Sequence, residues 1–183
     1  MIDVKNDMEI LVRREIDRRK GARAVGRTLC WCPHCEADVN ALALNNLPTR
    51  YCRGVNFGSA ASAGYGEKVR TAVDQAIVKV SQRPKHHPGA STRYRQEATC
   101  EDYALKFGCT LVDAAFPIDK MTCSCAECRA DTLALALNRY RPKYGVTGTG
   151  RASYQENFAD FIRHEIGQLL SATCQVVSAN PHH

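Results

Sequence analysis

An internal repeat constrains the fold of this chain more than any other feature of its sequence. Residues 30–51 align without a gap to residues 123–144, and 11 of the 22 positions are identical. Both segments begin with the pattern Cys-x-Cys-x-x-Cys and continue with Ala-Leu-Ala-Leu-Asn. Self-similarity of this kind indicates that one structural unit has been duplicated. We therefore expect two homologous units, residues 1–90 and residues 91–183.

A weaker similarity lies at the end of each half. The segment KVSQRPKHH at 79–87 resembles VVSANPHH at 176–183, and in both copies a His pair follows the proline within three residues. The second copy needs about four extra residues before this segment, which is an insertion of ordinary loop size. The two His pairs therefore belong to the duplicated unit.

The spacing of apolar residues predicts helices. Residues 7–19, 67–80 and 157–177 each place their apolar side chains on one helical face. Residues 37–45 are rich in Ala and Leu, and a proline at position 48 ends that helix. Each unit is thus expected to run helix, cysteine knuckle, helix, loop, helix, which makes the fold class all-α. Stretches rich in Gly, Ser and Thr are expected to be loops, at residues 54–66 and 145–153.

Charge and hydropathy argue against export and against membrane insertion. Eleven of the first 20 residues are charged, where a signal peptide would need an apolar stretch. No apolar run approaches the roughly 20 residues that span a bilayer. We therefore expect a cytoplasmic protein with no membrane partner. In a reducing compartment, ten cysteines clustered at short spacing favour metal binding over disulfides.

The repeated cysteine pattern predicts zinc. Three thiolates at this spacing can surround one ion, and a fourth ligand would complete a closed structural site in each unit. The thiolate ligands are expected to be Cys30, Cys32 and Cys35 in the first unit and Cys123, Cys125 and Cys128 in the second. The repeated His pairs are the best source of the fourth ligand, as His87 and His183. The alternatives are His86 or Cys100 in the first unit and His182 or Cys174 in the second.

Four cysteines have no counterpart in the other copy: Cys52, Cys100, Cys109 and Cys174. Cys174 aligns with Ile77 inside a helix, so a role as a small core residue is the simpler interpretation. The repeated Asn45 and Tyr51, with Asn138 and Tyr144, are consistent with a helix C-cap and a tyrosine that packs back on its own unit.

No catalytic constellation is visible in the sequence. The chain has no Ser/His/Asp set and no phosphate-binding or dinucleotide-binding glycine loop. The repeated acids Asp38 and Asp131 are expected to stabilise the N-terminal end of a helix. We therefore expect a protein that is not an enzyme.

The motifs of the first unit, taken together, resemble the late competence development protein ComFB family of bacteria. They are N-x-M-E-x-L-V-x-x-E-I at 6–16, the cysteine pattern, D-V-x-A-L-A-L-N-x-L-P-x-x-Y at 38–51 and V-S-x-x-P at 80–84. The second unit matches through 123–144 and its final Pro-His. It lacks the N-x-M-E start and has Arg141 in place of Pro48.

The resemblance implies a small, mainly helical protein with a structural zinc ion per unit. Family members are usually dimers of single units, so two fused units imply an intramolecular pseudo-dimer that is a monomer in solution. Some members are receptors for cyclic di-GMP and related cyclic dinucleotides and act in competence and motility. A receptor of this kind also needs a protein partner to receive its signal.

Such a ligand offers two phosphates and two purines, which suit arginine side chains and aromatic rings. The candidate ligand-binding residues are Arg14, Asn45, Arg50, Tyr51, Asn138, Lys143 and Tyr144, with Arg13 and Arg53 in a wider set. Two alternatives stay open. One is a protein- or nucleic-acid-binding adaptor without a small ligand, which would use the basic first helix. The other is a thiol-based redox or metal sensor.

Overall fold

The computed structural model describes residues 2–21, 29–54, 62–85, 98–114, 121, 123–147 and 156–181. The first unit consists of β1 (Val4–Asn6), α1 (Asp7–Gly21), α2 (Pro33–Asn45), β2 (Tyr51–Arg53) and α3 (Ser62–Gln82). The second unit repeats this order as β3 (Thr99–Asp102), α4 (Tyr103–Asp113), α5 (Ala126–Asn138), β4 (Tyr144–Thr147) and α6 (Glu156–Ala179). The mainly helical prediction is confirmed. The proposed boundary between residues 90 and 91 lies outside the described residues.

The all-α prediction missed two short sheets. β1 pairs antiparallel with β2, and β3 pairs antiparallel with β4. Strands of three or four residues are too short to show an alternating hydrophobic pattern, so periodicity could not reveal them. Two expected loops are also shorter than predicted, because α3 begins at Ser62 and β4 occupies positions 144–147.

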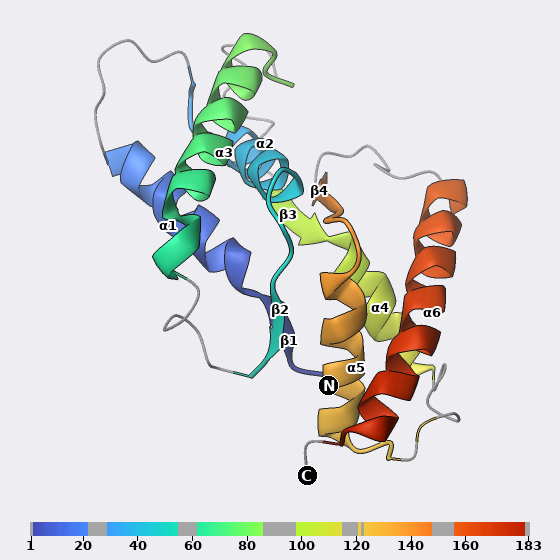
Figure 1. Ribbon diagram of the computed structural model, residues 1–183. Coiled ribbons are helices and arrows are strands. Elements are labelled where there is room, and N and C mark those ends of the chain that lie inside the picture. The colour runs from blue at the N-terminus through green and yellow to red at the C-terminus, as the bar shows by residue number, and fades with distance from the viewer. Residues whose placement is uncertain are drawn as a thin grey trace.

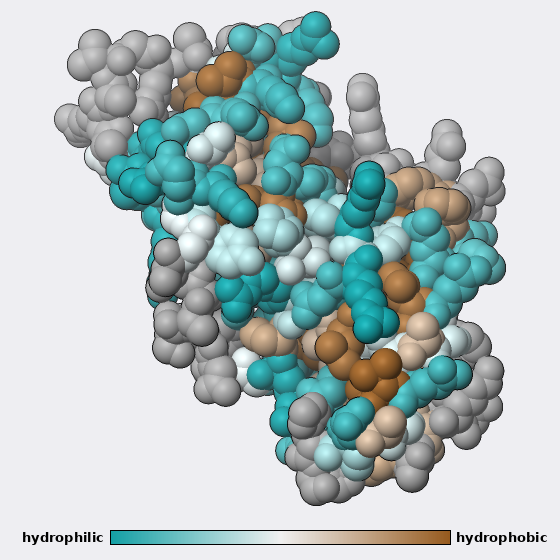
Figure 2. Space-filling model, in the orientation of Figure 1, coloured by the Kyte–Doolittle hydropathy of each residue, from teal (hydrophilic) through white to brown (hydrophobic). Residues whose placement is uncertain are grey.

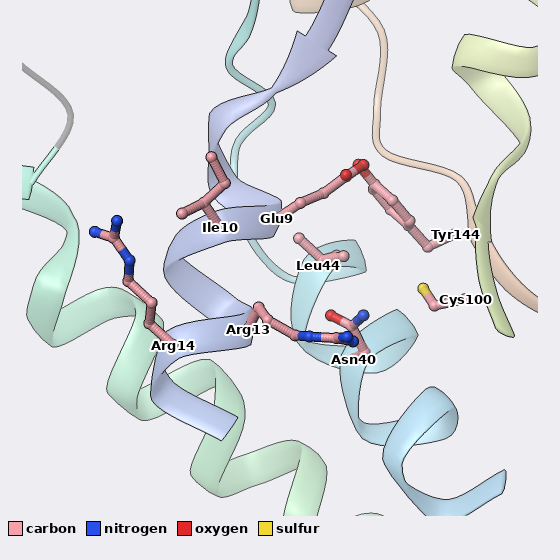
Figure 3. Close-up of a pocket in the computed structure, with 8 residues that line it drawn as sticks. All are labelled: Glu9, Ile10, Arg13, Arg14, Asn40, Leu44, Cys100 and Tyr144. Carbon is pink, nitrogen blue, oxygen red and sulfur yellow. The ribbon is translucent and has the colours of Figure 1, made fainter. Parts of the chain in front are cut away.

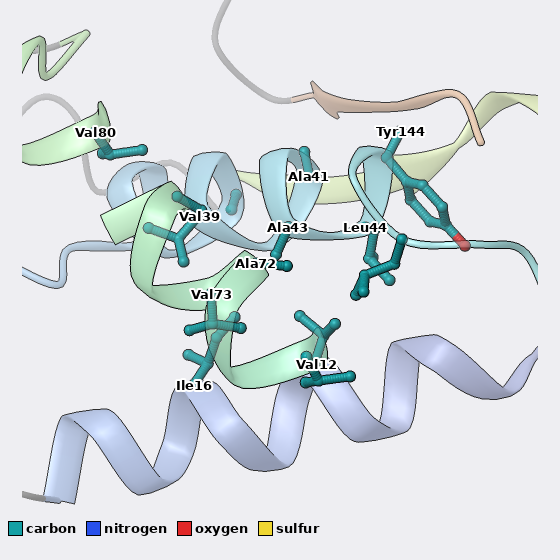
Figure 4. Packing of buried hydrophobic residues seen from close by; sticks show 14 of the residues in the cluster. Val12, Ile16, Val39, Ala41, Ala43, Leu44, Ala72, Val73, Val80 and Tyr144 are labelled. Atoms are coloured by element: carbon teal, nitrogen blue, oxygen red, sulfur yellow. The ribbon is translucent and has the colours of Figure 1, made fainter. Parts of the chain in front are cut away.

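The helices of each unit pack around one apolar core. In the first unit, Val12 and Ile16 of α1 meet Val39 of α2 and Val73 of α3, and all four side chains are fully buried (Figure 4). Their spacing of three or four residues along each helix explains why one stripe per helix is apolar. The second core uses equally buried residues of α5 and α6, namely Leu133, Leu137, Ile162, Ile166 and Leu170.

Each unit packs its two-stranded sheet on a helix of the other unit, an arrangement that we call the strand exchange. The β1–β2 sheet of the first unit packs on α5 of the second, and the β3–β4 sheet packs on α2 of the first (Figure 1). Tyr144 accordingly belongs to the core of the first unit, whereas Tyr51 and Val4 belong to the core of the second. Each core is therefore complete only in the presence of the other unit.

The side chains of two asparagines stabilise this arrangement through hydrogen bonds between the units. The Asn45 side chain donates from Nδ2 to the Tyr144 carbonyl (2.9 Å) and accepts at Oδ1 from the Tyr144 backbone N–H (2.8 Å). Asn138 makes the same two bonds with the backbone of Tyr51, at 2.8 and 2.6 Å. The prediction that these asparagines cap their own helices is wrong, since Asn46 and Arg139 occupy the C-cap positions. The two tyrosines likewise pack into the opposite unit rather than into their own.

Within the described part of the chain, no helix is both long enough and apolar enough to cross a membrane.

Candidate functional site

A cavity of about 400 Å³ lies where α1 and α2 of the first unit meet the β3–β4 sheet of the second (Figure 3). Both units contribute to its wall, so it depends on the strand exchange. The lining residues are Glu9, Ile10, Arg13, Arg14, Asn40, Leu44, Cys100 and Tyr144. Its volume is in the range of small-molecule binding sites.

Two arginines give this cavity its charge. Arg13 and Arg14 are exposed on α1, and neither makes an ion pair with any described residue. The basic residues at the end of the same helix differ in this respect. Arg18 and Arg19 bind Glu15, Arg19 also binds Asp74, and Lys20 binds Glu36, at 2.6 to 2.8 Å. The uncompensated positive charge of α1 therefore lies at the cavity.

Asn40 supplies an unused polar group. Its Oδ1 atom is buried and has no hydrogen-bond partner among the described residues, and Asn40 lines the cavity together with Arg13 (Figure 3). A buried polar atom without a partner costs about 1–3 kcal/mol. At the equivalent position, 93 residues later, the second unit has the fully buried Leu133. The fold therefore has no need of a polar residue here.

The inner end of the cavity is a buried network of acids and phenols. The Tyr144 hydroxyl donates to Glu9 Oε1 (2.7 Å) and accepts from Asn6 Nδ2 (3.0 Å), while the Tyr51 hydroxyl donates to Asp102 Oδ2 (2.6 Å). Burial raises the pKa of Glu9 and the pKa of Asp102 above their ordinary values. Burial also raises the pKa of both tyrosines, so their hydroxyl groups remain donors.

Cys100 lies on the wall of this cavity rather than at a thiol cluster. Burial, with the nearby Glu9 and Asp102 carboxylates, raises the pKa of its thiol to about 12. The thiol is therefore protonated at neutral pH and behaves as a small apolar wall residue.

The corresponding position in the second unit is filled with apolar side chains. Asn6 pairs with Tyr51 in one sheet and Asp102 pairs with Tyr144 in the other, which fixes the correspondence between the units. In this alignment of the two units, Glu9 corresponds to Leu105, Arg13 to Cys109 and Asn40 to Leu133. All three replacements pack in the second core. The polar cavity is thus specific to the first unit.

The structure brings together only part of the predicted ligand set. Arg14 and Tyr144 line the cavity, and Arg13 of the wider set joins them. The side chain of Arg50 instead lies 5.2 Å above the ring of Tyr65, and Lys143 lies 5.5 Å from the ring of Phe158.

Other members of the set hold the two units together. Asn45, Asn138 and the backbone of Tyr51 form the hydrogen bonds between units described above. Arg53 of β2 forms ion pairs with Glu127 (3.0 Å) and Asp131 (3.5 Å) of α5. Glu9 and Asn40 were not singled out from the sequence, although the Asn-to-Leu difference between the repeats marks position 40.

The cysteine patterns form two compact clusters. The three sulfur atoms of each cluster lie within 4.8 Å of one another, and the Cys30 and Cys35 sulfurs are 3.6 Å apart. A tetrahedral zinc ion with Zn–S distances of about 2.3 Å places its sulfur ligands about 3.8 Å apart. The thiols therefore fit a zinc ion, and both clusters could hold a metal.

Helix geometry favours the thiolate form of one cluster thiol. Cys32 and Cys125 are the N-cap residues of α2 and α5, and Cys32 makes no side-chain cap hydrogen bond. The Cys125 sulfur accepts a hydrogen bond from the backbone N–H of Cys128 (3.5 Å), and this bond lowers the pKa of the Cys125 thiol. Burial acts in the opposite direction on Cys35 and Cys128, because it raises the pKa of their thiols.

The predicted histidine ligands, His86, His87, His182 and His183, lie outside the described residues, but their neighbours are placed. Lys85 Nζ contacts Asp38 Oδ1 at 2.5 Å, and Asp38 lies three residues beyond Cys35 on α2. The chain that leads into His86 is therefore tied to the helix that carries the first cluster. Cys100 and Cys174 lie outside both clusters; Cys174 is buried in α6, as expected for a core residue.

A similar arrangement holds in the second unit. Figure 1 shows the C-terminal end of α6 beside the start of α5, which carries the second cluster. The hydroxyl group of Thr173 donates to the Thr132 carbonyl (3.2 Å), which joins the two helices near this end.

A duplicated helical unit with a three-thiol cluster at the start of its second helix defines the class of this protein. The family model of the late competence development protein ComFB matches the chain twice, over residues 5–84 and residues 101–181. The chain therefore belongs to the ComFB family and consists of two tandem units. No curated protein and no solved structure gives a significant match.

Proposed function

We propose that this chain is a non-enzymatic, zinc-stabilised receptor for a cyclic dinucleotide of the cyclic di-GMP type, acting in control of competence or motility. The observation that carries the proposal is the cavity between the two units, on whose wall two arginines and an asparagine oxygen have no ionic or hydrogen-bond partner among the described residues. The proposed ligand site is the first-unit cavity alone.

The chemistry of the cavity suits this ligand. The planar guanidinium groups of Arg13 and Arg14 can each bind a phosphate through two parallel hydrogen bonds. The Nδ2 group of Asn40 can donate to an acceptor on the edge of a purine. The apolar side chains of Ile10 and Leu44 offer contact area for the base.

The position of the cavity suits a receptor. A ligand there contacts α1 and α2 of the first unit and Tyr144 of the second, so its binding energy depends on how the units sit against each other. Any shift of β4 acts directly on Glu9, because Tyr144 donates a hydrogen bond to it (2.7 Å). A protein partner that binds at the junction of the two units would thereby respond to the bound ligand.

The reciprocal contacts support an intramolecular pseudo-dimer. Asn45 with Tyr144 and Asn138 with Tyr51 are the paired contacts of an isologous interface, in which each contact occurs twice with the partners exchanged. Since one chain supplies both halves, the protein is a monomer in solution.

Zinc is the structural cofactor, with two ions per chain. Cys30, Cys32 and Cys35 with His87 hold the first ion, and Cys123, Cys125 and Cys128 with His183 hold the second. Closed sites of this type contribute to folding rather than to catalysis.

Calorimetric titration of the zinc-loaded protein with cyclic di-GMP tests the ligand proposal, with cyclic di-AMP and GMP as controls. We expect saturable binding at one site per chain. Replacing both arginines, Arg13→Gln with Arg14→Gln, should weaken binding at least tenfold and leave two zinc ions bound.

The matched control removes two other exposed cations, Lys79→Gln with Arg83→Gln, and should bind as the unmodified protein does. Absence of binding to cyclic di-GMP, or an equal loss in the control, would overturn the proposed function.

A further inference from the structure

A second cleft, with a different charge and shape, lies between the end of α5 and the outer face of α6. Its volume is about 560 Å³. The lining residues are Arg139, Tyr140, Arg141, Lys143, Phe161, Glu165, Gln168 and Leu169. All belong to the second unit, so the cleft is separate from the cavity proposed for the cyclic dinucleotide.

Positive charge dominates this cleft. Arg139 and Arg141 make no ion pair with any described residue, and Lys143 lies against the ring of Phe158. The one acid, Glu165, accepts a hydrogen bond from the Tyr140 hydroxyl (2.8 Å) rather than from a cation. The three cations occupy alternate positions along five residues, and the two arginines are exposed and therefore available to an anionic partner.

The cleft also exposes an aromatic ring. Phe161 is 53% exposed, the largest exposure among the large hydrophobic residues of the described chain. Figure 2 shows hydrophobic surface between hydrophilic side chains over the region of α5 and α6. Since Phe161 contributes little to the core, its ring is free to contact a partner.

The corresponding surface of the first unit lacks the two arginines and the exposed ring. Arg139 and Arg141 correspond to Asn46 and Pro48, and the fixed offset between α3 and α6 makes Gly64 the counterpart of Phe161. Lys143 corresponds to another cation, Arg50. The fold of the repeat therefore requires neither the two arginines nor the ring, and the second unit has them in one cleft.

We propose that this cleft binds single-stranded nucleic acid. Binding without sequence preference combines a positively charged groove along the backbone with aromatic rings on which bases stack. The arginines would contact phosphates, and Phe161 would stack on an unpaired base. An acidic peptide would use the charges alone, whereas the exposed ring favours a ligand with flat faces. The net charge of +6 attracts a polyanion to the chain.

Fluorescence anisotropy of a labelled 20-nucleotide oligothymidine with the zinc-loaded full chain tests this proposal. Replacing both arginines, Arg139→Gln with Arg141→Gln, should weaken binding at least tenfold. The slope of log K against log salt should fall by about 1.4, because two phosphate contacts are lost. The matched charge control, Lys79→Gln with Arg83→Gln, should bind as the unmodified chain does.

Phe161→Ala tests the stacking contact separately. It should weaken binding at least fivefold and leave the salt slope unchanged, because no charge is lost. A duplex of the same length should compete at least fivefold less well, since its bases are already stacked. Equal losses in the charge control, or an unaltered affinity for Phe161→Ala, would overturn the proposal. Binding of a polyglutamate peptide that matches the oligonucleotide would assign the cleft to an acidic protein instead.

The cyclic dinucleotide site and the nucleic-acid cleft can be tested independently of each other. The Arg139→Gln with Arg141→Gln protein should keep its affinity for cyclic di-GMP, and the Arg13→Gln with Arg14→Gln protein should keep its affinity for oligothymidine. Zinc content and far-ultraviolet circular dichroism establish that each variant is folded.

Discussion

The side-chain amide of Asn45 hydrogen-bonds both polar backbone groups of Tyr144, across the junction of the two units. The amide thus forms the same pair of hydrogen bonds that a backbone residue of a neighbouring strand would form with β4. Asn138 does the same for Tyr51. Residues that are identical in the two repeats therefore join them, and positions at which the repeats differ supply the arginines of both clefts.

Removing one of these amides should destabilise the whole chain. Asn45→Ala leaves the N–H and C=O of the buried Tyr144 without partners, at a cost of about 1–3 kcal/mol. Urea unfolding followed by circular dichroism measures this loss. Asn46→Ala is the control, because the Asn46 side chain donates to the Leu42 carbonyl of its own helix (2.7 Å) and not across the junction. Equal stability of the two variants would contradict the role of Asn45.

Replacing a cluster thiol should remove one metal ion. Cys32→Ser is expected to lower the zinc content from two ions per chain to one and to lower the melting temperature of the chain, since a structural zinc site supplies on the order of 10 kcal/mol to folding. Elemental analysis and thermal melting measure both effects. Cys52→Ser, outside the clusters, should keep both ions. Retention of two ions by Cys32→Ser would refute the site.

The fourth zinc ligand can be identified by competition with a chelator. His87→Ala should lose zinc to a colorimetric chelator faster than the unmodified chain, because three thiolates leave the ion open to attack. Cys100→Ser should lose zinc at the unmodified rate, as its sulfur lies on the cavity wall. The reverse order would assign the ligand to Cys100.

The buried Glu9 should make stability depend on pH. Burial raises its pKa from 4.5, so the folded chain holds a proton that the unfolded chain releases. Stability then falls as the pH rises from about 4.5 through the raised folded-state pKa. Glu9→Gln removes this contribution, so its stability relative to the unmodified chain should increase across that range and then level off. Urea unfolding at several pH values measures the difference, in which the zinc contribution cancels. A constant difference would show that Glu9 is not perturbed.

A single exchange between the repeats should separate binding from folding. Asn40→Leu introduces the residue found at position 133, which is fully buried in the second core. We expect at least a tenfold loss of cyclic di-GMP affinity. The free energy of unfolding should equal or exceed that of the unmodified chain, because the buried amide oxygen has no partner in the part of the chain that the structure describes. Calorimetry and urea unfolding measure the two quantities. Unchanged affinity would exclude this cavity as the ligand site.

Much of the local structure follows from the sequence. The ungapped repeat establishes the duplication, helical spacing places α1, α3 and α6 to within a few residues, and the Cys-x-Cys-x-x-Cys pattern brings each thiol cluster together. These features depend on residues near one another in the chain, where spacing alone determines which side chains share a helical face or surround one point.

Only the tertiary structure decided how the two halves meet. Asn45 and Tyr144 are 99 residues apart, and no local pattern reveals that one binds the backbone of the other. The strand exchange that joins them also encloses the cavity, and it depends on contacts between distant segments. The same holds for charge: Arg19 and Lys20 pair with Asp74 and Glu36, which only the fold brings beside them, whereas Arg13 and Arg14 form no ion pair with a described residue. The sequence thus determines the parts of this protein, and long-range packing determines which of their polar groups remain available for a ligand.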